Sequence, residues 1–275
     1  MALLTVAGLS ARLSPPNLNP DNNSMPHDEP LEDRLYRDPD LAQFYDLENR
    51  WGPDLDYCLR LAKDARSVLD LGCGTGQLAA RLAEGRHVVG VDPAAAMLEI
   101  ARQRPGGDRV TWVEADARRV RLEQRFDLVV LTGHAFQVFL TNEDQRAVLS
   151  TIAEHLAPDG RFIFDTRNPA AEEWLEWLPE NSGRQFEAPG LGLVEAWNNA
   201  SHDAASGIVT YHTHYRLVGS GRQYSASSDI RFTDRGPLAA MLNEAGLAVD
   251  QWLGHWNGGP CGPASPEFIP IGRLR

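Results

Sequence analysis

The sequence predicts an α/β fold in which a doubly wound, mostly parallel sheet carries an antiparallel β insertion. Three observations predict it. Residues 68–76 (VLDLGCGTG) form a buried-strand pattern that runs through an acidic residue into a glycine-rich turn, with a helical pattern after it. Strand and helix patterns then alternate as far as Asp165, which is typical of a parallel sheet covered by helices on both sides. After Asp165, strand-like segments follow one another without helices between them.

The elements of the parallel sheet follow in order. A polar helical segment comes first, because apolar residues recur every three or four positions over residues 31–63. The parallel strands are predicted over residues 67–71, 87–91, 110–114, 126–131 and 161–165. The helices between them are predicted over residues 77–83, 94–104 and 143–156. Residues 126–131 are almost continuously apolar, as expected for a strand buried on both faces.

The insertion is predicted to begin after the fifth strand, with a short helix over residues 169–177 and a strand over residues 192–198. Residues 208–218 and 224–232 alternate apolar and polar side chains, and the turn Gly219-Ser220-Gly221 between them indicates a hairpin. A helix over residues 236–245 is stopped by Gly246. Two last strands, over residues 248–256 and 268–272, complete the sheet.

These elements divide the chain into five parts. Residues 1–24 form a tail that we expect to be disordered, because residues 14–23 are rich in Pro and Asn. The first 13 residues lack the basic start of a signal peptide, and Met25 is a plausible start of the protein. The other parts are a helical segment (25–66), a ligand-binding core (67–167), the helix and antiparallel β insertion (168–234), and the last helix and strand pair (235–275).

Composition excludes several classes of protein. The chain has 275 residues, 43% of them apolar, which is enough for one large domain with an insertion. Its formal net charge is −12 and no basic cluster occurs, so nucleic acid is not expected as the main partner. The three cysteines are scattered, which favours a reducing compartment. No apolar run approaches the ~20 residues of a membrane span, and we expect a cytoplasmic protein.

The glycine turn indicates what kind of ligand binds. Glycines let the backbone approach a ligand closely, because no Cβ stands in the way. Asp70 immediately before the turn adds a carboxylate that a pyrophosphate site would not accommodate. The combination therefore favours a ligand that carries a positive charge near the turn.

Four spaced motifs together resemble the class I S-adenosylmethionine-dependent methyltransferases of the small-molecule type. They are VLDLGCGTG at 68–76, VGVD at 89–92, EADA at 114–117 and LAPDGRFIF at 156–164. The resemblance covers residues 31–167 and, more loosely, 232–275. It implies a Rossmann-like sheet of seven strands with an antiparallel C-terminal strand, and S-adenosyl-L-methionine as the cofactor.

The resemblance also assigns roles at the strand ends. The turn with Gly72, Gly74 and Gly76 would pass under the amino acid end of the cofactor, and Asp70 would bind its ammonium group. Asp92 would accept hydrogen bonds from the ribose hydroxyls. Asp116 would accept from the adenine amino group, with the backbone of Ala117 beside the ring. Each acid has a plainer alternative as a helix or turn cap.

Five further residues complete the expected cofactor site: Tyr45, Cys73, Pro93, Met97 and Thr132. Met97 could pack on the adenine or belong to the ordinary core. Tyr45 could close over the cofactor, as N-terminal helices do in many relatives, or simply pack.

On the acceptor side, His134 follows the fourth strand, where it could bind the acceptor or remove a proton from it. The plainer alternative is a histidine that shapes the pocket. Trp174 and Trp177 could line the acceptor pocket or anchor the insertion. His212 and His214 lie two apart on one strand, but no third ligand is evident, so no metal is expected.

The expected activity is methyl transfer from S-adenosylmethionine to an N or O atom of a small molecule. The turn also fits G-x-G-x-x-A at 74–79, but an NAD(P)-dependent enzyme would explain neither Asp70 nor Asp116. A non-catalytic S-adenosylmethionine-binding sensor is the competing class. Methylation of a protein or RNA is a further alternative, which the acidic charge disfavours. The insertion could bind the acceptor or form a homodimer contact, and the sequence does not decide between the two.

Overall fold

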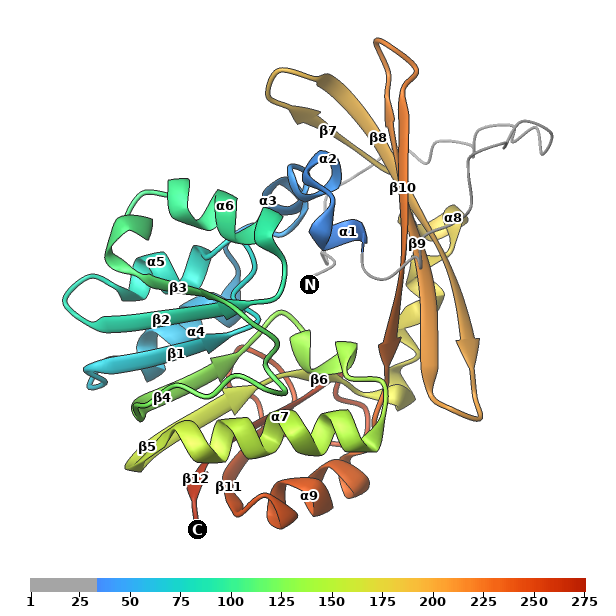
Figure 1. Cartoon of the computed structure of the whole chain (residues 1–275). Helices are drawn as coiled ribbons and strands as arrows, with labels where there is room; N and C mark the ends of the chain where they lie inside the picture. Colours follow the sequence, from blue (N-terminus) through green and yellow to red (C-terminus); the bar gives the residue numbers. More distant parts are fainter. Residues whose placement is uncertain (1–33) are drawn as a thin grey trace.

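The structure, a computed structural model, describes residues 34–275 and consists of two sheets with a short helical segment between them (Figure 1). The tail expected over residues 1–24 and the beginning of the helical segment lie outside the described residues. Within residues 34–275, no helix combines the length and apolar character needed to cross a membrane.

The larger sheet has the strand order β11-β12-β5-β4-β1-β2-β3, and short β6 also pairs with β12. Strands β1 to β5 run parallel, and β12 is antiparallel to both of its neighbours, as expected. The strand order reverses between β1 and β4, which is where open α/β sheets bind ligands. The strands are β1 (Ser67–Leu71), β2 (His87–Asp92), β3 (Thr111–Glu114), β4 (Phe126–Leu131), β5 (Leu156–Phe164), β6 (Thr166–Arg167), β11 (Leu247–Leu253) and β12 (Glu267–Leu274).

Alternate residues of the parallel strands supply two apolar cores, one on each face of the sheet. Leu69 and Leu71 of β1 face one core, which α7 (Asn142–His155) and α9 (Arg235–Glu244) cover. Val68 faces the other core, which α4 (Pro53–Leu61) and α5 (Gln77–Leu82) cover. Helix α6 (Ala95–Gln103) connects β2 to β3 (Figure 1). Burial on both faces fixes the register of the strands, because a slip of one residue would exchange the side chains that fill the two cores.

The second sheet is antiparallel, with the order β10-β9-β8-β7. Its strands are β7 (Arg184–Ala188), β8 (Gly192–Asp203), β9 (Ile208–Leu217) and β10 (Gln223–Arg231). The alternate residues predicted to share a face of the hairpin are buried together in one core with Trp174 and Trp177. Sequence analysis did not predict β7 or β6. The edge strand β7 was missed because the first of its inward-facing residues, Arg184, is charged, which leaves only Phe186 and Ala188 to show the alternation.

The helical segment predicted over residues 31–63 is broken into short helices. They are α1 (Arg34–Arg37), α2 (Pro39–Ala42), α3 (Tyr45–Glu48) and α4. Proline begins α2 and α4, since its fixed φ suits a helix start but its ring prevents a helix from continuing through it. The predicted helix over residues 169–177 is likewise two 3-10 turns, η3 (Pro169–Ala171) and η4 (Glu173–Trp177), separated by Glu172 with φ +48°. A turn of α-helix, α8 (Pro179–Ser182), follows them.

The segment formed by α1, α2 and α3, residues 34–48, lies between the two sheets, and we call it the bridging segment (Figure 1). Helix α1 contacts both α6 of the core and β10 of the second sheet. Phe44 is fully buried and stacks on Tyr215 of β9 with ring centroids 4.5 Å apart. The bridging segment is therefore packed into both halves of the molecule.

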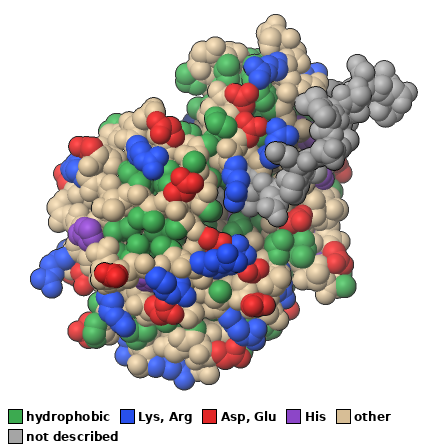
Figure 2. Space-filling view, viewed as in Figure 1, with side chains coloured by type: hydrophobic (Ala, Val, Ile, Leu, Met, Phe, Trp, Pro, Cys, Tyr) green, Lys and Arg blue, Asp and Glu red, His purple; other side chains and the backbone are tan. Residues whose placement is uncertain are grey.

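The molecular surface seen in Figure 2 carries basic and acidic side chains interspersed over this face, with no broad region of one sign among the described residues. This distribution agrees with the sequence, in which no basic cluster stands out.

Candidate active site

The glycine turn joins β1 to α5 and is held by backbone and side-chain contacts. Gly74 has φ +52°, a conformation that glycine adopts without strain. A Cβ at Gly74 would lie 3.8 Å from the ring of Tyr45, so the bridging segment closes directly over the turn. A Cβ at Gly72 would lie 3.1 Å from Ala135, which places the loop after β4 against the same turn.

Asp70 and Asp92 are two buried acids at neighbouring strand ends. Asp70 is 2% exposed, and burial, with the charge of Asp92 second, raises its pKa to about 8. Burial also raises the pKa of Asp92, although backbone N–H groups of Ala94 and Gly74 oppose the shift. Two acids in this environment favour a cationic ligand, since a positive charge nearby would stabilise both carboxylates.

Asp92 also caps the turn before α6, which is its plainer alternative from the sequence, and it binds the glycine turn, which the sequence alone did not indicate. Its Oδ2 accepts from the backbone N–H of Gly74 at 2.8 Å, and its Oδ1 accepts from Ala94 at 2.9 Å. Each carboxylate oxygen has a second lone pair, so these two hydrogen bonds leave room for ribose hydroxyls to bind Asp92. Binding of the ribose stays a prediction.

Asp116 lies after β3 and is engaged by Arg118. The Arg118 backbone N–H donates to Asp116 at 2.8 Å, and the guanidinium binds both carboxylate oxygens while also reaching Asp144 at 2.7 Å. The Arg118 side chain lowers the pKa of Asp116. The turn-capping alternative is thus present in the structure, and recognition of adenine by Asp116 stays a prediction. Ala117 beside it is buried in the core.

The remaining predicted cofactor residues occupy different environments. Met97 is 1% exposed and packs with Ala42 and Ala94 under the bridging segment. The backbone of Cys73 donates to Val91 at 3.1 Å, which ties the turn to β2. Pro93 is exposed, and Thr132 is half-buried at the end of β4. Their contacts with a cofactor stay predictions.

Tyr45 lies over the turn on α3. Burial, with the charges of Asp92 and Asp46, raises the pKa of its phenol well above the usual range. Its ring packs edge-on against Tyr36, with centroids 6.1 Å apart. The phenol is therefore neutral at physiological pH and can act as a hydrogen-bond donor above Gly74.

His134 lies in a cluster of three acid–base groups at the edge of the sheet. Its backbone adopts φ +59°, and its N–H donates to both oxygens of Asp165, at 3.1 and 3.2 Å. Its Nε2 lies 2.8 Å from Oε1 of Glu267. One ligand atom from each residue lies within 4.8 Å of the others, a spacing that could also hold a metal ion. The sequence alone did not indicate such a set.

Burial shifts the pKa values of the two acids of this cluster. It raises the pKa of both Asp165 and Glu267, and the charge of Asp165 raises that of Glu267 further. Arg167 opposes both shifts from nearby. The cluster can therefore exchange protons closer to neutral pH than ordinary carboxyl groups can.

Arg167 connects this cluster to the second sheet. It is 1% exposed, donates to Glu173 and to Gln137 at 2.9 Å each, and lies over the ring of Trp177 at 5.0 Å. Trp174 packs on His202 and Phe232 in the core of the second sheet. Both tryptophans thus anchor the insertion, and a direct contact with an acceptor stays a prediction for each.

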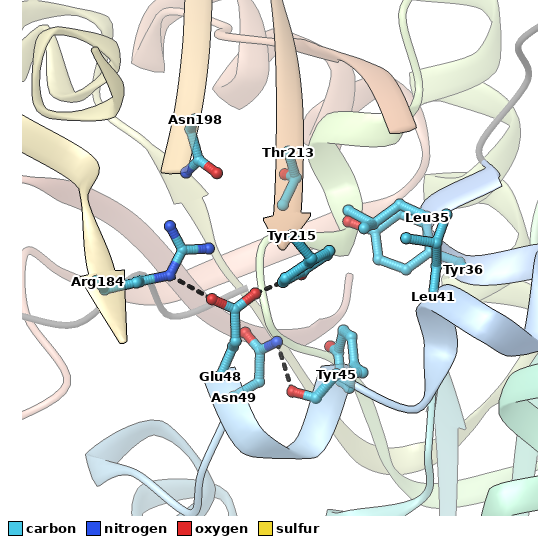
Figure 3. Close-up of a pocket in the computed structure, with 10 residues that line it drawn as sticks. All are labelled: Leu35, Tyr36, Leu41, Tyr45, Glu48, Asn49, Arg184, Asn198, Thr213 and Tyr215. Carbon is cyan, nitrogen blue, oxygen red and sulfur yellow. Dashed lines mark hydrogen bonds and ion pairs between the residues drawn. The ribbon is translucent and has the colours of Figure 1, made fainter. Parts of the chain in front are cut away.

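A pocket opens between the bridging segment and the second sheet (Figure 3). Asn198 of β8 points into it, and its buried amide oxygen has no hydrogen-bond partner. On the opposite wall, the carboxylate of Glu48 binds Arg184 and the hydroxyl of Tyr215. The lining residues are Leu35, Tyr36, Leu41, Tyr45, Glu48, Asn49, Arg184, Asn198, Thr213 and Tyr215.

Sequence analysis missed Asp165 and Glu267 as site residues for different reasons. Asp165 follows a parallel strand, so the rule that identified Asp70 and Asp92 could have found it. Glu267 begins an antiparallel strand and reaches the same edge only because it pairs with Arg167. His212, which is exposed, and half-buried His214 lie on β9 outside the described cluster.

Comparison with known proteins gives a consistent picture. The family described as "Methyltransferase domain" matches residues 68–160. The chain is 30% identical over 242 residues to the dTDP-3-amino-3,6-dideoxy-alpha-D-glucopyranose N,N-dimethyltransferase of Streptomyces fradiae, a match that covers 81% of this chain and 88% of that protein. Several other curated relatives match over little more than a third of this chain, and the chain spans 44%, 43% and 36% of the length of three of them.

Solved structures show the same fold over most of the chain. The CcbJ methyltransferase from Streptomyces caelestis superposes with a TM-score of 0.73 at 22% identity, covering 90% of this chain and 99% of that one. S-adenosylmethionine-bound CalS10, an amino pentose methyltransferase from Micromonospora echinaspora, superposes with a TM-score of 0.63 at 22% identity, covering 90% of this chain and 100% of that one.

Proposed function

This chain belongs to the class I S-adenosylmethionine-dependent methyltransferases of small molecules, and from that premise we propose that its acceptor is an amino nitrogen on a small, polar molecule such as an amino sugar. The cluster of His134, Asp165 and Glu267 carries the proposal. Carboxyl groups at the edge of the cofactor site favour an acceptor that arrives as an ammonium ion. The name of the Streptomyces fradiae relative, whose substrate is an amino sugar, points the same way.

The described residues fit the cofactor. The pair of buried acids, Asp70 and Asp92, matches a ligand with an ammonium group beside hydroxyl groups. The backbone of the glycine turn carries no side chain at Gly74 and lies next to Tyr45, so a ligand beside the turn can approach it closely. When bound, the sulfonium supplies an activated methyl group and its own leaving group.

The chain's contribution is then to orient the amine and to take its proton. An ammonium ion has no lone pair, so it must lose a proton before the nitrogen can attack. Glu267 or His134 can accept that proton, because the raised pKa of Glu267 brings it toward that of an amine. Asp165 fixes the backbone of His134 through two hydrogen bonds and so orients the imidazole. Transfer of the methyl group would break the S–CH3 bond and form the N–CH3 bond, so the positive charge would pass from sulfur to nitrogen and the product would already be a methylated ammonium ion.

The test compares an amine with its hydroxyl counterpart. The probes are dTDP-3-amino-3,6-dideoxy-α-D-glucopyranose and the same nucleotide sugar with a hydroxyl group at position 3. We expect methyl transfer to the amine, detected by mass spectrometry, and none to the hydroxyl analogue. Transfer to the hydroxyl alone, or cofactor binding with no turnover on a broad panel of amines and phenols, would contradict the proposal.

Substitution of His134 tests the acid–base role separately. We expect His134→Ala to lower turnover about 10²- to 10⁴-fold, the usual range for general acid–base catalysis. Cofactor affinity, measured by calorimetry, should change less than twofold. Equal losses in turnover and affinity would instead make His134 a residue that shapes the cofactor pocket.

Two predictions from the sequence remain open under this proposal. A homodimer contact through the second sheet is checked by analytical ultracentrifugation of the full chain. The cytoplasmic location is checked by cell fractionation. Neither bears on the assignment of the acceptor.

A further inference from the structure

Helix α3 carries two carboxylates that bind opposite halves of the molecule. Asp46 faces the glycine turn of the core, and Glu48, two residues later, faces the second sheet. Tyr45, which covers Gly74, lies beside Asp46 on the same single turn of helix. The position of Tyr45 over the cofactor site therefore depends on what these two acids bind.

Asp46 is the main link between the bridging segment and the cofactor turn. Its Oδ1 accepts from the hydroxyl of Thr75 at 2.6 Å and from the amide of Gln77 at 3.1 Å. Its Oδ2 pairs with Arg104, whose Nε also donates to the carbonyl of Thr75 at 2.9 Å. One carboxylate thus binds the turn, the first residue of α5 and the end of α6.

The backbone beside Asp46 adds to this link. The amide of Gln77 donates to the carbonyl of Asn49 at 2.6 Å, so α5 binds the end of α3 as well as its side chain. Thr75 is 2% exposed, which shields its contact with Asp46 from water. The Asp46 side chain itself is 35% exposed, so the strength of the link comes from several charge-assisted hydrogen bonds that converge on one carboxylate.

Glu48 makes the corresponding link to the second sheet. Its carboxylate pairs with Arg184 of β7 and accepts from the hydroxyl of Tyr215 on β9. Phe44, one turn earlier in the chain, stacks on the same tyrosine. Opening the bridging segment away from the turn would therefore have to break contacts on the sheet side too.

We propose that Asp46 is a positioning residue that latches Tyr45 over the bound cofactor, and that Glu48 couples this latch to the second sheet. Neither acid needs to touch the methyl acceptor. The latch acts on the cofactor's release, because Tyr45 packs against the turn at Gly74 and a ligand bound beside the turn is held in place until the bridging segment moves. The inference requires cofactor binding alone and does not depend on which acceptor is methylated.

The chain supplies a matched control on the same segment. Asp40 of α2 pairs with Arg222, beside β10, at 2.9 Å, so it too links the bridging segment to the second-sheet region. Both side chains of this pair are more than half exposed, however, and exposed ion pairs contribute little. Asp40→Asn removes one such link without touching the latch.

The experiment measures how fast labelled S-adenosylmethionine leaves each variant when chased with unlabelled ligand. We expect Asp46→Asn to release it about ten- to a hundredfold faster, the range for loss of hydrogen bonds to a charged group. Glu48→Gln should speed release several-fold, although it lies on the sheet side. Asp40→Asn should stay within twofold of the wild-type rate.

A second variant separates a latch from a general folding defect. Arg104→Gln breaks the same ion pair from the core side, and its effect on release should be non-additive with Asp46→Asn in the double variant. Hydrogen exchange over residues 34–48 should be faster in Asp46→Asn while exchange in β4 and α7 is unchanged. Unchanged release from Asp46→Asn, or equal effects of Asp46→Asn and Asp40→Asn, would overturn the latch. Unchanged release from Glu48→Gln would overturn the coupling.

Discussion

Replacement of Asp70 by Asn tests whether a buried acid is held in the cofactor site at a cost in stability. The ordinary pKa of this carboxyl group is 3.8, and burial raises it to about 8 in the folded chain. Between these values the folded state keeps a proton that the unfolded state has lost. Asp70 therefore contributes most to stability at low pH, and its contribution falls as the pH rises toward 8.

The size of the effect follows from the two pKa values. At ~1.4 kcal/mol for each pH unit, raising the pH from 5 to 8 should lower the free energy of unfolding by about 4 kcal/mol through Asp70 alone. This is an upper bound, because water and local rearrangement relieve part of the burial. Asn has nearly the same shape and no charge, so Asp70→Asn should lack this contribution. The free energy of unfolding of the variant should therefore rise relative to that of the wild type as the pH rises.

The assay is urea unfolding without cofactor at several values between pH 5 and pH 8. The result is the difference in the free energy of unfolding between wild type and variant at each pH, since the titration of Asp165 and Glu267 affects both proteins alike. Cofactor affinity should fall at least tenfold in Asp70→Asn at pH 8, because the ammonium group loses its carboxylate partner. A difference in unfolding free energy that stays constant over the pH range would refute the reasoning.

Three further substitutions test the turn. Asp92→Ala removes the acceptor for two backbone N–H groups, and we expect it to weaken cofactor binding by about 1.5–3 kcal/mol in calorimetry and to lower the melting temperature; unchanged affinity in the folded variant would contradict the ribose role. Gly76→Ala places a Cβ 2.4 Å from the ring of Trp112 at φ +75°, so the free energy of unfolding should fall by about 2–5 kcal/mol from backbone strain and overpacking. Gly74→Ala, whose Cβ would meet nothing nearer than 3.8 Å, should lose only about 1–2 kcal/mol, and equal losses would contradict this comparison.

Local patterns were sufficient to predict most of the parallel sheet. Asp70 and Asp92 could be placed together because both follow apolar runs and parallel strands end at one edge of a sheet. The fifth strand was predicted from its apolar end alone. It begins earlier, at Leu156, because Leu156 already pairs with Phe126 of β4.

Contacts that depend on distant pairing could not be predicted from the sequence. Glu267 reaches His134 across 133 positions of the chain, and only the antiparallel register of β12 brings it there. Asp46 is one of several acids in a polar helical pattern, and nothing local distinguishes it from Asp40 or Glu48. Its role depends on the packing of the bridging segment between two sheets, which periodicity does not describe.

The place of β12 has a consequence for how the protein is made. This strand fills the gap between β5 and β11, yet it is synthesised after the entire second sheet. The nascent chain must therefore carry β5 with an unpaired edge while some hundred further residues emerge. Open strand edges promote association between incomplete chains, so slow translation of this stretch should increase aggregation. The acid–base cluster can form only when β12 has paired and brought Glu267 to His134. Newly made chains should therefore bind the cofactor before they can catalyse methyl transfer.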